Sequence, residues 1–328
     1  MKRLSYLLLS LFLVAFLLAG LTWFKAQSAP VASDTSLKDF LIVKGSSASQ
    51  IANKLEKEGF IKNSLAFRIY VQLTGLSKKI PAGEYRLSPS YSLFRLVAEL
   101  LKGPTEIWVT IPEGLRREEI AEKFTSAFGK GEDFSDRFLE AADGLEGFLF
   151  PDTYLFPKTA SASAVVVKMR STFDKKIAEL DEKINSGSLT VGQVITLASI
   201  VERETKFAAE RPIIAGILLN RLNLGMGLAA DATVQYAIAT SKCSGRTDCE
   251  WWPTLTKEDL SINSAYNTYR FKGLPPSPIA NPGLSAIRAV VEPEESEYLY
   301  YLHDEKGVAH YARTLEEHNA NVRKYLGQ

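Results

Sequence analysis

Residues 190–205 read TVGQVITLASIVERET, a predicted helix that is apolar on nearly every face. A helix of this kind is buried inside a protein, because it has no polar face to turn toward water. Thr190 is a suitable cap for its first turn. The helix ends abruptly in two glutamates, Glu202 and Glu204, on either side of Arg203. We therefore expect a core helix whose last turn brings carboxylates to the edge of the core.

These two glutamates are the first candidates for chemistry. Loss of water around a carboxylate disfavours its charged form and raises its pKa, which suits a general acid that works near neutral pH. Because they are two positions apart, Glu202 and Glu204 point to different sides of the helix and cannot act as a facing pair. Periodicity does not choose between them. The alternative is that both only cap the helix end, in ion pairs with Arg203, Lys206 or Arg211.

The N-terminus carries a second long apolar run, Leu4–Phe24, which holds no charged residue. It reaches the roughly 20 residues that a helix needs to cross a bilayer, and Lys2 and Arg3 before it favour a cytoplasmic N-terminus. The competing interpretation is a cleaved signal peptide, whose apolar stretch is about 7–15 residues and ends in a small-residue site. The longer run and the poor site at Ala26–Ala29 favour a retained anchor. Both interpretations place the rest of the chain outside the cytoplasm.

The composition is that of a folded protein of about two domains, with 328 residues, 46% of them hydrophobic. The 39 basic and 38 acidic side chains give a net charge of +1, so no nucleic-acid partner is expected. The two cysteines, Cys243 and Cys249, are too few for a disulfide framework. Outside the cytoplasm they could close a short disulfide loop, with two free thiols as the alternative. Zinc is not expected, because four ligands are usual and no His cluster adjoins them.

Two similar phrases follow the apolar run. Residues 40–45, FLIVKG, predict a short strand and a turn before a helix that contains Ile51. Residues 107–114, IWVTIPEG, predict the same before a helix that contains Ile120. Two such units resemble the small βααβ modules of the LysM type, which bind glycan in cell walls. A structural spacer domain is the alternative, since strand, turn and helix often follow one another.

The second half of the chain is mainly helical, so the predicted fold class is α+β. Besides residues 190–205, helices are predicted over Val165–Ile184, Pro212–Leu222 and Thr314–Leu326, the last with a capping box. A hairpin is predicted from Glu297–His303 and Val308–Tyr311. The expected parts are a cytoplasmic tip and transmembrane anchor (1–25), a linker (26–37), a LysM-like subdomain (38–104), a second LysM-like unit with its connection (105–159) and a helical lobe with a C-terminal hairpin and helix (160–328).

Five phrases stand in order along the chain. They are EGFLFPDTY (146–154), LASIVERET (197–205), the stretch 215–222 that ends in NRL, YNTY (266–269) with GLPP (273–276) and PIANPG (278–283), and TLEEHN (314–319). In order and spacing they resemble the MltG/YceG-like family of endolytic murein transglycosylases. One phrase alone is a weak signal, whereas five in order are highly specific. The resemblance covers essentially the whole chain, the anchor included.

The resemblance implies that Glu202 is the catalytic acid/base and that residues 160–328 form a transglycosylase domain. The implied reaction cleaves the β-1,4 bond between N-acetylmuramic acid and N-acetylglucosamine of peptidoglycan. It uses no water, because the muramic acid 6-hydroxyl closes onto C1 and leaves a 1,6-anhydro end. One carboxylate is enough: it protonates the leaving oxygen, the substrate's N-acetyl group stabilises C1, and the carboxylate then deprotonates the 6-hydroxyl. No metal or other cofactor is required.

The resemblance also implies a place and a substrate state. The place is the inner membrane, with a cytoplasmic N-terminus and a periplasmic body, and cell-wall synthases are the candidate partners. Endolytic cutting is implied by the resemblance alone, whereas the anchor favours the trimming or termination of growing strands at the membrane where new glycan emerges. A tether of about ten residues would keep the catalytic lobe within a few nanometres of the membrane.

A saccharide groove needs aromatic faces and hydrogen-bonding side chains close to the acid. YNTY supplies both kinds, and the stretch from Asp231 adds polar side chains. The expected substrate-binding residues are Tyr266, Asn267, Thr268, Tyr269, Asp231, Thr233 and Gln235. The alternative for the tyrosines is packing inside a loop-rich lobe. The family usually has Ser-Asp-Pro-Thr where this chain has Ala230-Asp231-Ala232-Thr233; the missing proline alters the stiffness of the loop and keeps the Asp and Thr.

Two other functions stay open. With Asp231 as a second carboxylate the protein would be a muramidase that hydrolyses the same bond, since most glycoside hydrolases use two carboxylates roughly 5–9 Å apart. Alternatively it would be a non-catalytic scaffold that binds peptidoglycan through its LysM-like units. The retained phrase around Glu202 argues against the scaffold.

Overall fold

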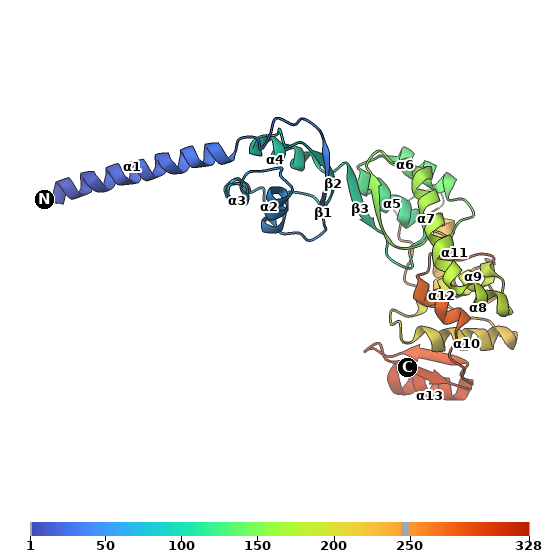
Figure 1. Cartoon of the computed structure of the whole chain (residues 1–328). Helices are drawn as coiled ribbons and strands as arrows, with labels where there is room; N and C mark the ends of the chain where they lie inside the picture. Colours follow the sequence, from blue (N-terminus) through green and yellow to red (C-terminus); the bar gives the residue numbers. More distant parts are fainter. Residues whose placement is uncertain (1, 244–248, 328) are drawn as a thin grey trace. The chain divides into compact units, whose positions relative to one another are not determined.

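The chain forms two compact units and has mixed α and β structure, which confirms the α+β class expected from the sequence. The computed structural model describes residues 2–243 and 249–327 (Figure 1). The first unit contains the chain up to Trp108 together with Leu155–Lys158. The second unit contains Val109–Tyr154 and the chain from Thr159 onward.

The first unit packs its helices against a small antiparallel sheet. β1 (Lys38–Ile42) and β2 (Gly83–Leu87) pair with Phe40 opposite Tyr85, and the start of β3 (Glu106–Thr110) pairs with β2 on its other side. Phe40 and Tyr85 are both buried, because alternate side chains of a strand point to the same face. The helices of this unit are α1 (Lys2–Gln27), α2 (Ala48–Lys57), α3 (Ser64–Leu73) and α4 (Leu93–Lys102).

The order strand, helix, helix, strand occurs twice. The first copy is β1–α2–α3–β2, and the second consists of β3, α5 (Arg117–Phe128), α6 (Glu132–Ala141) and β4 (Thr153–Pro157). β3 and β4 are antiparallel neighbours. Two backbone hydrogen bonds join their ends, from Lys158 N to Thr105 O and from Ile111 N to Asp152 O, both 3.0 Å. Both phrases that predict strand, turn and helix therefore lie in a βααβ arrangement. The boundary between the compact units falls within β3 and β4, so α5 and α6 belong to the second unit.

The rest of the second unit is mainly helical, as expected. The helix predicted over Val165–Ile184 is divided into α7 (Ala162–Ile177), the short 3-10 helix η1 (Ala178–Leu180) and α8 (Asp181–Ser186). The predicted hairpin is present as β5 (Tyr300–His303) and β6 (Ala309–Ala312). The remaining elements are α9 (Val191–Glu204), α10 (Arg211–Asn223), α11 (Asp231–Lys242), η2 (Asp259–Ser261), α12 (Leu284–Val291) and α13 (Leu315–Tyr325).

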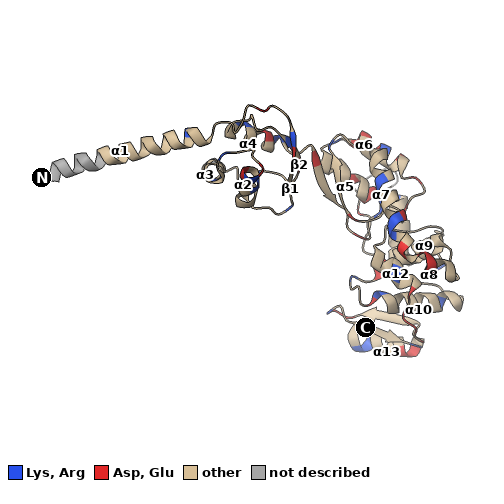
Figure 2. Ribbon diagram, in the orientation of Figure 1, with Lys and Arg blue, Asp and Glu red and all other residues tan. Residues whose placement is uncertain are grey.

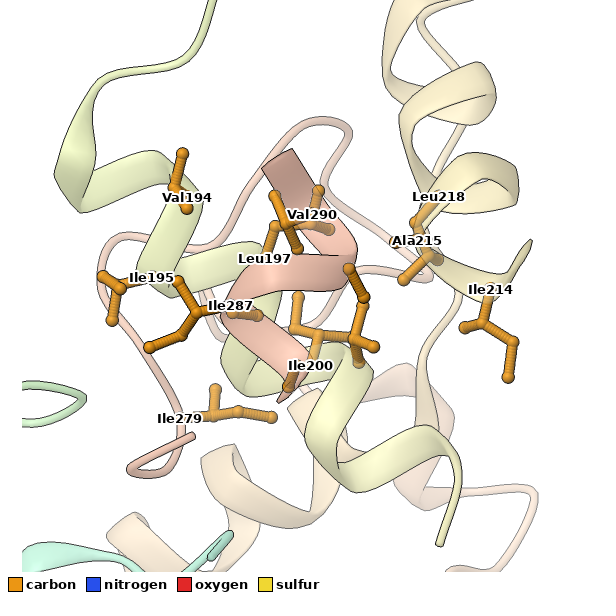
Figure 3. Packing of buried hydrophobic residues seen from close by; sticks show 14 of the residues in the cluster. Val194, Ile195, Leu197, Ile200, Ile214, Ala215, Leu218, Ile279, Ile287 and Val290 are labelled. Carbon is orange, nitrogen blue, oxygen red and sulfur yellow. The ribbon is translucent and has the colours of Figure 1, made fainter. Parts of the chain in front are cut away.

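Helix α9 lies within the core of the second unit, as its sequence predicts. Thr190 and Gln193 form a capping box at its start, and every residue from Val194 to Val201 is buried. Figure 3 shows its apolar side chains packed together with those of α10 and α12, around Leu197 and Ile287. Burial stabilises the folded state by about 1.5–3 kcal/mol for each large aliphatic side chain. The last turn of α9 is therefore held firmly in place by the turns before it.

The N-terminal helix α1 is apolar but short over the part whose side chains are described. From residue 11 to residue 27 its one charged side chain is Lys25, near the end (Figure 2). Among the residues described in full, no single helix is long and apolar enough to cross a membrane. Residues 162–186 and 191–204 together have the length and apolar composition of a membrane span, with a bend of 111° between them. The second of these segments is α9, however, and α9 is buried in the core. The anchor expected over Leu4–Phe24 stays a prediction.

Cys243 and Cys249 are joined in a disulfide, with their Cα atoms 6.0 Å apart. Of the two alternatives that the sequence leaves open, the closed loop is therefore the one present. Cys243 is buried beside Ala239 and Trp251. Residues 244–248, between the two cysteines, lie outside the described part of the chain. The bridge joins the end of α11 to the segment that carries Trp251.

Candidate active site

The two glutamates at the end of α9 are both partly buried and have different surroundings. Only 5% of the Glu202 side chain is exposed. Its Oε1 accepts a hydrogen bond from Arg211 Nη2 (2.5 Å), and its Oε2 accepts one from Gly283 N (3.0 Å). Burial raises the pKa of Glu202, while the Gly283 N–H and the charge of Arg211 lower it. Both carboxylate oxygens therefore have a partner within the protein.

Arg211 connects Glu202 to a third charged group. It is buried at the start of α10, and its Nη1 and Nη2 both lie 3.4 Å from Glu113 Oε2. Glu113 belongs to the turn after β3, and 45% of its side chain is exposed. Position 283 is close to this carboxylate, because a Cβ on Gly283 would overlap it. The cluster ties the end of α9 to the turn at Glu113 and to the PIANPG loop.

A buried asparagine holds the loop that carries Gly283. Asn281 has no exposed surface, and its Nδ2 donates to Leu115 O (3.0 Å) and to Glu146 Oε1 (2.8 Å). Its Oδ1 accepts a hydrogen bond from Leu149 N (2.9 Å). Burial raises the pKa of Glu146. One side chain thus joins two of the family phrases, EGFLFPDTY and PIANPG, to each other and fixes the backbone N–H of Gly283.

Glu204 points to another side of α9 and borders a cavity of about 420 Å³. Tyr301 OH donates a hydrogen bond to its Oε2 (2.7 Å). Burial raises the pKa of Glu204; the Tyr301 hydroxyl lowers it, and the negative charge of Asp231 raises it. The other side chains around this cavity include Arg221, Asp231, Tyr269, Tyr300, His303 and His318. Glu204 therefore faces space large enough for a sugar.

Asp231 and Tyr269 are the predicted substrate residues that line this cavity. Tyr269 OH donates to Asp231 Oδ1 (2.6 Å), and 42% of Tyr269 is exposed. The chain enters α11 through Ala229, whose φ of +48° is left-handed and costs about 1–2 kcal/mol in a residue with a Cβ. A hydrogen bond from Ala229 N to Thr268 O (3.2 Å) holds that turn. The position of Asp231 is thus set by a constrained piece of backbone.

A smaller hollow of about 210 Å³ also borders Glu204 and His303. Phe207, with 54% of its surface exposed, and Lys206 line this hollow. His303 lines both hollows, and its Nε2 lies 3.0 Å from Glu210 Oε2. This hydrogen bond fixes the position of the imidazole ring. Glu204 therefore lines both hollows.

Three of the predicted substrate residues are buried and hydrogen-bonded to their own loops. Asn267 Nδ2 donates to the carbonyls of Leu260 and Ile262, both at 2.9 Å. Thr233 Oγ1 and Thr268 Oγ1 lie 2.9 Å apart. None of the three is more than 1% exposed. In this structure their polar groups stabilise the backbone around Asp231 and Tyr269.

The last two predicted residues are partly buried and also have protein partners. Tyr266 OH lies 2.5 Å from Ser277 Oγ, and its ring centroid is 4.8 Å from that of Tyr236. Gln235 Nε2 donates to Pro253 O (2.9 Å). The sequence leaves open that the tyrosines are packing residues. Tyr266 is packed in this way, whereas Tyr269 is exposed. Substrate contact for these two residues stays a prediction.

The sequence did not identify Arg221, Tyr301 or His303 as residues of this cavity. Arg221 stands in the NRL phrase and donates to Leu299 O (2.6 Å) and Leu228 O (2.5 Å), which fixes the chain that enters the hairpin. The signal in the sequence is the tyrosine-rich start of the hairpin, which by itself predicts only β-structure. Within residues 11–243 and 249–327, no three His, Cys, Asp or Glu side chains are grouped so that they could hold a metal ion.

Known proteins resemble this chain over almost its whole length. The profile of the YceG-like family matches residues 40–324. A Bacillus subtilis protein named endolytic murein transglycosylase is 31% identical, over 92% of this chain and 89% of its own length. A protein of the same name from Streptococcus pneumoniae D39 is 29% identical, over 89% of this chain and 60% of its own length. The crystal structure of a YceG-like protein from Listeria monocytogenes matches with a TM-score of 0.60 and 31% identity, over 87% of this chain and 98% of that one.

The role of Asn281 is open to a stability test. Replacing Asn281 by Ala leaves the buried Leu149 N without its partner, which costs about 1–3 kcal/mol. It also removes the amide hydrogen bond to Glu146, which then keeps the Arg117 N–H as a partner. We expect the apparent melting temperature, followed by circular dichroism, to fall clearly. The matched control is Asn319→Ala on the exposed surface of α13, which should leave it nearly unchanged. Equal melting temperatures for the two variants would contradict the bridging role of Asn281.

Proposed function

Because the chain belongs to the YceG-like family, we propose that it is a lytic transglycosylase that cleaves the β-1,4 bond between N-acetylmuramic acid and N-acetylglucosamine inside peptidoglycan strands. Two relatives that match it over about nine-tenths of its length are named endolytic murein transglycosylases. The observation that carries the proposal is a partly buried carboxylate, Glu204, beside a cavity of about 420 Å³ whose lining includes three tyrosines. The expected products are strands that end in 1,6-anhydro-N-acetylmuramic acid.

We propose Glu204 as the acid/base, in preference to the neighbouring Glu202 that the family resemblance suggested from sequence. A general acid must reach the substrate, and Glu204 borders the cavity, whereas both oxygens of Glu202 bind Arg211 and Gly283. The pKa is raised in both glutamates, so the choice rests on access; in Glu204 the raised pKa favours holding a proton for the leaving oxygen. The same carboxylate then takes the proton of the muramic acid 6-hydroxyl, while the substrate's N-acetyl group stabilises C1. Tyr301 orients the carboxylate.

The second candidate function is hydrolysis of the same bond, and one observation favours it. Asp231 lines the same cavity as Glu204 and is close enough to raise its pKa, so two carboxylates face one space. An inverting or retaining hydrolase needs such a pair. Tyr269, however, already donates a hydrogen bond to Asp231. We assign Asp231 and Tyr269 to substrate binding, together with Tyr266, and the buried polar residues around them to shaping the loop.

The proposed setting of this activity is the outer face of the inner membrane. Lys2 and Arg3 followed by the uncharged run Leu4–Phe24 support an anchor with a cytoplasmic N-terminus. The two βααβ arrangements support LysM-like glycan-binding units ahead of a catalytic lobe at residues 160–328. Nascent glycan emerges from synthases at this face, so we propose these strands as the substrate, their release as the end of elongation, and the synthases as partners.

The two glutamates are distinguished by a pair of single variants. Glu204→Gln should fold normally but lower kcat/KM on purified sacculi by about 10²–10⁴-fold, the contribution of a general acid. Glu202→Gln should retain cleavage per folded molecule and melt at lower temperature, because opening a buried ion pair from one side costs up to about 3–5 kcal/mol. If Glu202→Gln were stable and inactive while Glu204→Gln remained active, the roles of the two residues would be reversed.

The products decide between the two reaction types. We expect mass spectrometry of fragments released from sacculi to show anhydro-muropeptides, each lighter by one water than the corresponding product of hydrolysis. Fragments that all carry the added water would establish a muramidase. Protein that binds sacculi and releases nothing, under conditions in which its fold is intact, would leave only the non-catalytic scaffold.

The pH profile tests the assignment of the acid through Tyr301. Cleavage needs protonated Glu204, so kcat/KM should fall as the pH rises through its pKa. The Tyr301 hydroxyl stabilises the carboxylate and lowers that pKa. In Tyr301→Phe the pKa of Glu204 rises, and the falling limb should move to higher pH. Tyr300→Phe is the control, because its ring lines the same cavity but stacks on His318; a limb that moves equally in both variants would contradict the assignment.

A further inference from the structure

The end of α1 is packed into the first unit. The ring centroid of Phe24 in α1 lies 6.2 Å from that of Phe94 in α4, and Tyr70 in α3 contacts the same Phe94 ring at 5.1 Å. One turn later, Leu93 N donates to Ser28 O (3.0 Å). Figure 1 shows α1 ending beside α4. The end of the apolar helix α1 and the helices α3 and α4 of the first unit therefore contribute to one small aromatic cluster.

The segment that follows α1 is also bound to this unit. Val31 N and Ala32 N donate to Pro89 O, at 3.1 and 3.3 Å. The buried Ser88 Oγ donates to Asp34 O (2.8 Å). A free segment of ten small polar residues would have a root-mean-square span of about 17 Å and would let the unit move away from α1. These hydrogen bonds hold the segment along the turn between β2 and α4 instead.

Exposed apolar and basic side chains surround the place where α1 meets the unit. Leu73 follows Tyr70 by one turn of α3 and is 84% exposed, although it is a large aliphatic residue. Phe94 is 46% exposed and Trp23 is 38% exposed. Arg95 next to Phe94 is exposed as well, and no acidic residue occurs between Ser64 and Lys79, a stretch that ends in two lysines.

We propose that this surface, formed by Trp23, Tyr70, Leu73, Phe94 and Arg95 and called here the α1-proximal face, lies in the headgroup layer of the bilayer that α1 enters. The occupant is the lipid itself, because the face is continuous with the apolar helix. Aromatic side chains prefer the membrane–water interface, and basic residues are attracted to anionic lipid. The first unit is then seated on the membrane rather than tethered above it. This inference rests on the proposed anchoring by α1.

A single fluorescent label tests this placement in the full-length chain. Leu73→Cys, labelled with bimane, is reconstituted into vesicles of phosphatidylethanolamine and phosphatidylglycerol, with the Cys243–Cys249 disulfide intact so that the new thiol alone reacts. Val43→Cys is the control, an apolar residue of the same unit that is 59% exposed on the turn after β1. We expect brominated lipid to quench the label at 73 several-fold more than the label at 43, and aqueous iodide to do the reverse.

The other outcomes separate the failure of this inference from the failure of the anchor. If the protein floats with the vesicles but iodide quenches both labels equally, the anchor holds and the seated face is refuted. If the label at 73 is shielded from both quenchers, a second copy or another protein covers the face, which also refutes lipid as its occupant. Protein that does not float with the vesicles refutes the anchor and with it this inference.

Discussion

The burial of α9 through its last turn is the constraint on which the proposed site depends. Eight successive residues, Val194 to Val201, are buried, so the position and rotation of this helix are fixed before it reaches the glutamates. Residues two apart on a helix differ in direction by about 200°. One carboxylate must then turn toward Arg211 and the PIANPG loop, and the other toward the hairpin. The same helix thereby supplies an internal ion pair and a candidate acid from neighbouring positions.

The phrases that identify the family are explained mainly by what they hold in place. Asn281 connects PIANPG to EGFLFPDTY, and Arg221 of NRL fixes the chain that leads to Tyr301. Asn267 and Thr268 bind the loops from which Tyr269 emerges. Such residues are constrained because a buried polar group without a partner is costly. The residues of a family motif therefore need not touch the substrate. In this chain, lining of the open cavity distinguishes the residues that could bind substrate from those that hold the loops in place.

The sequence predicted most of the architecture and part of the site. The capped core helix, the repeated strand–turn–helix order and the hairpin follow from periodicity and caps, which are local properties. The division of the helix over Val165–Ile184 was missed, because η1 carries the same residue types as its neighbours. The choice between Glu202 and Glu204 depends on what faces each side of α9, and those groups come from the loop at Gly283 and from Tyr301, about 80 and 100 residues away. Pattern alone gives the direction of a side chain but not its partner.

The segment between α1 and β1 shows the same distinction between composition and contact. Small polar residues predict a linker, yet the atoms that bind this segment are largely backbone N–H and C=O groups, which every sequence supplies. The consequence concerns how closeness to the membrane is achieved. A flexible tether limits only the greatest distance that the body can reach, whereas, with α1 anchored as proposed, a unit fixed to the end of α1 would stay at the bilayer at all times. With the proposed substrate, glycan newly formed at that surface, the fixed arrangement would raise the local concentration of strands without any contact to a synthase.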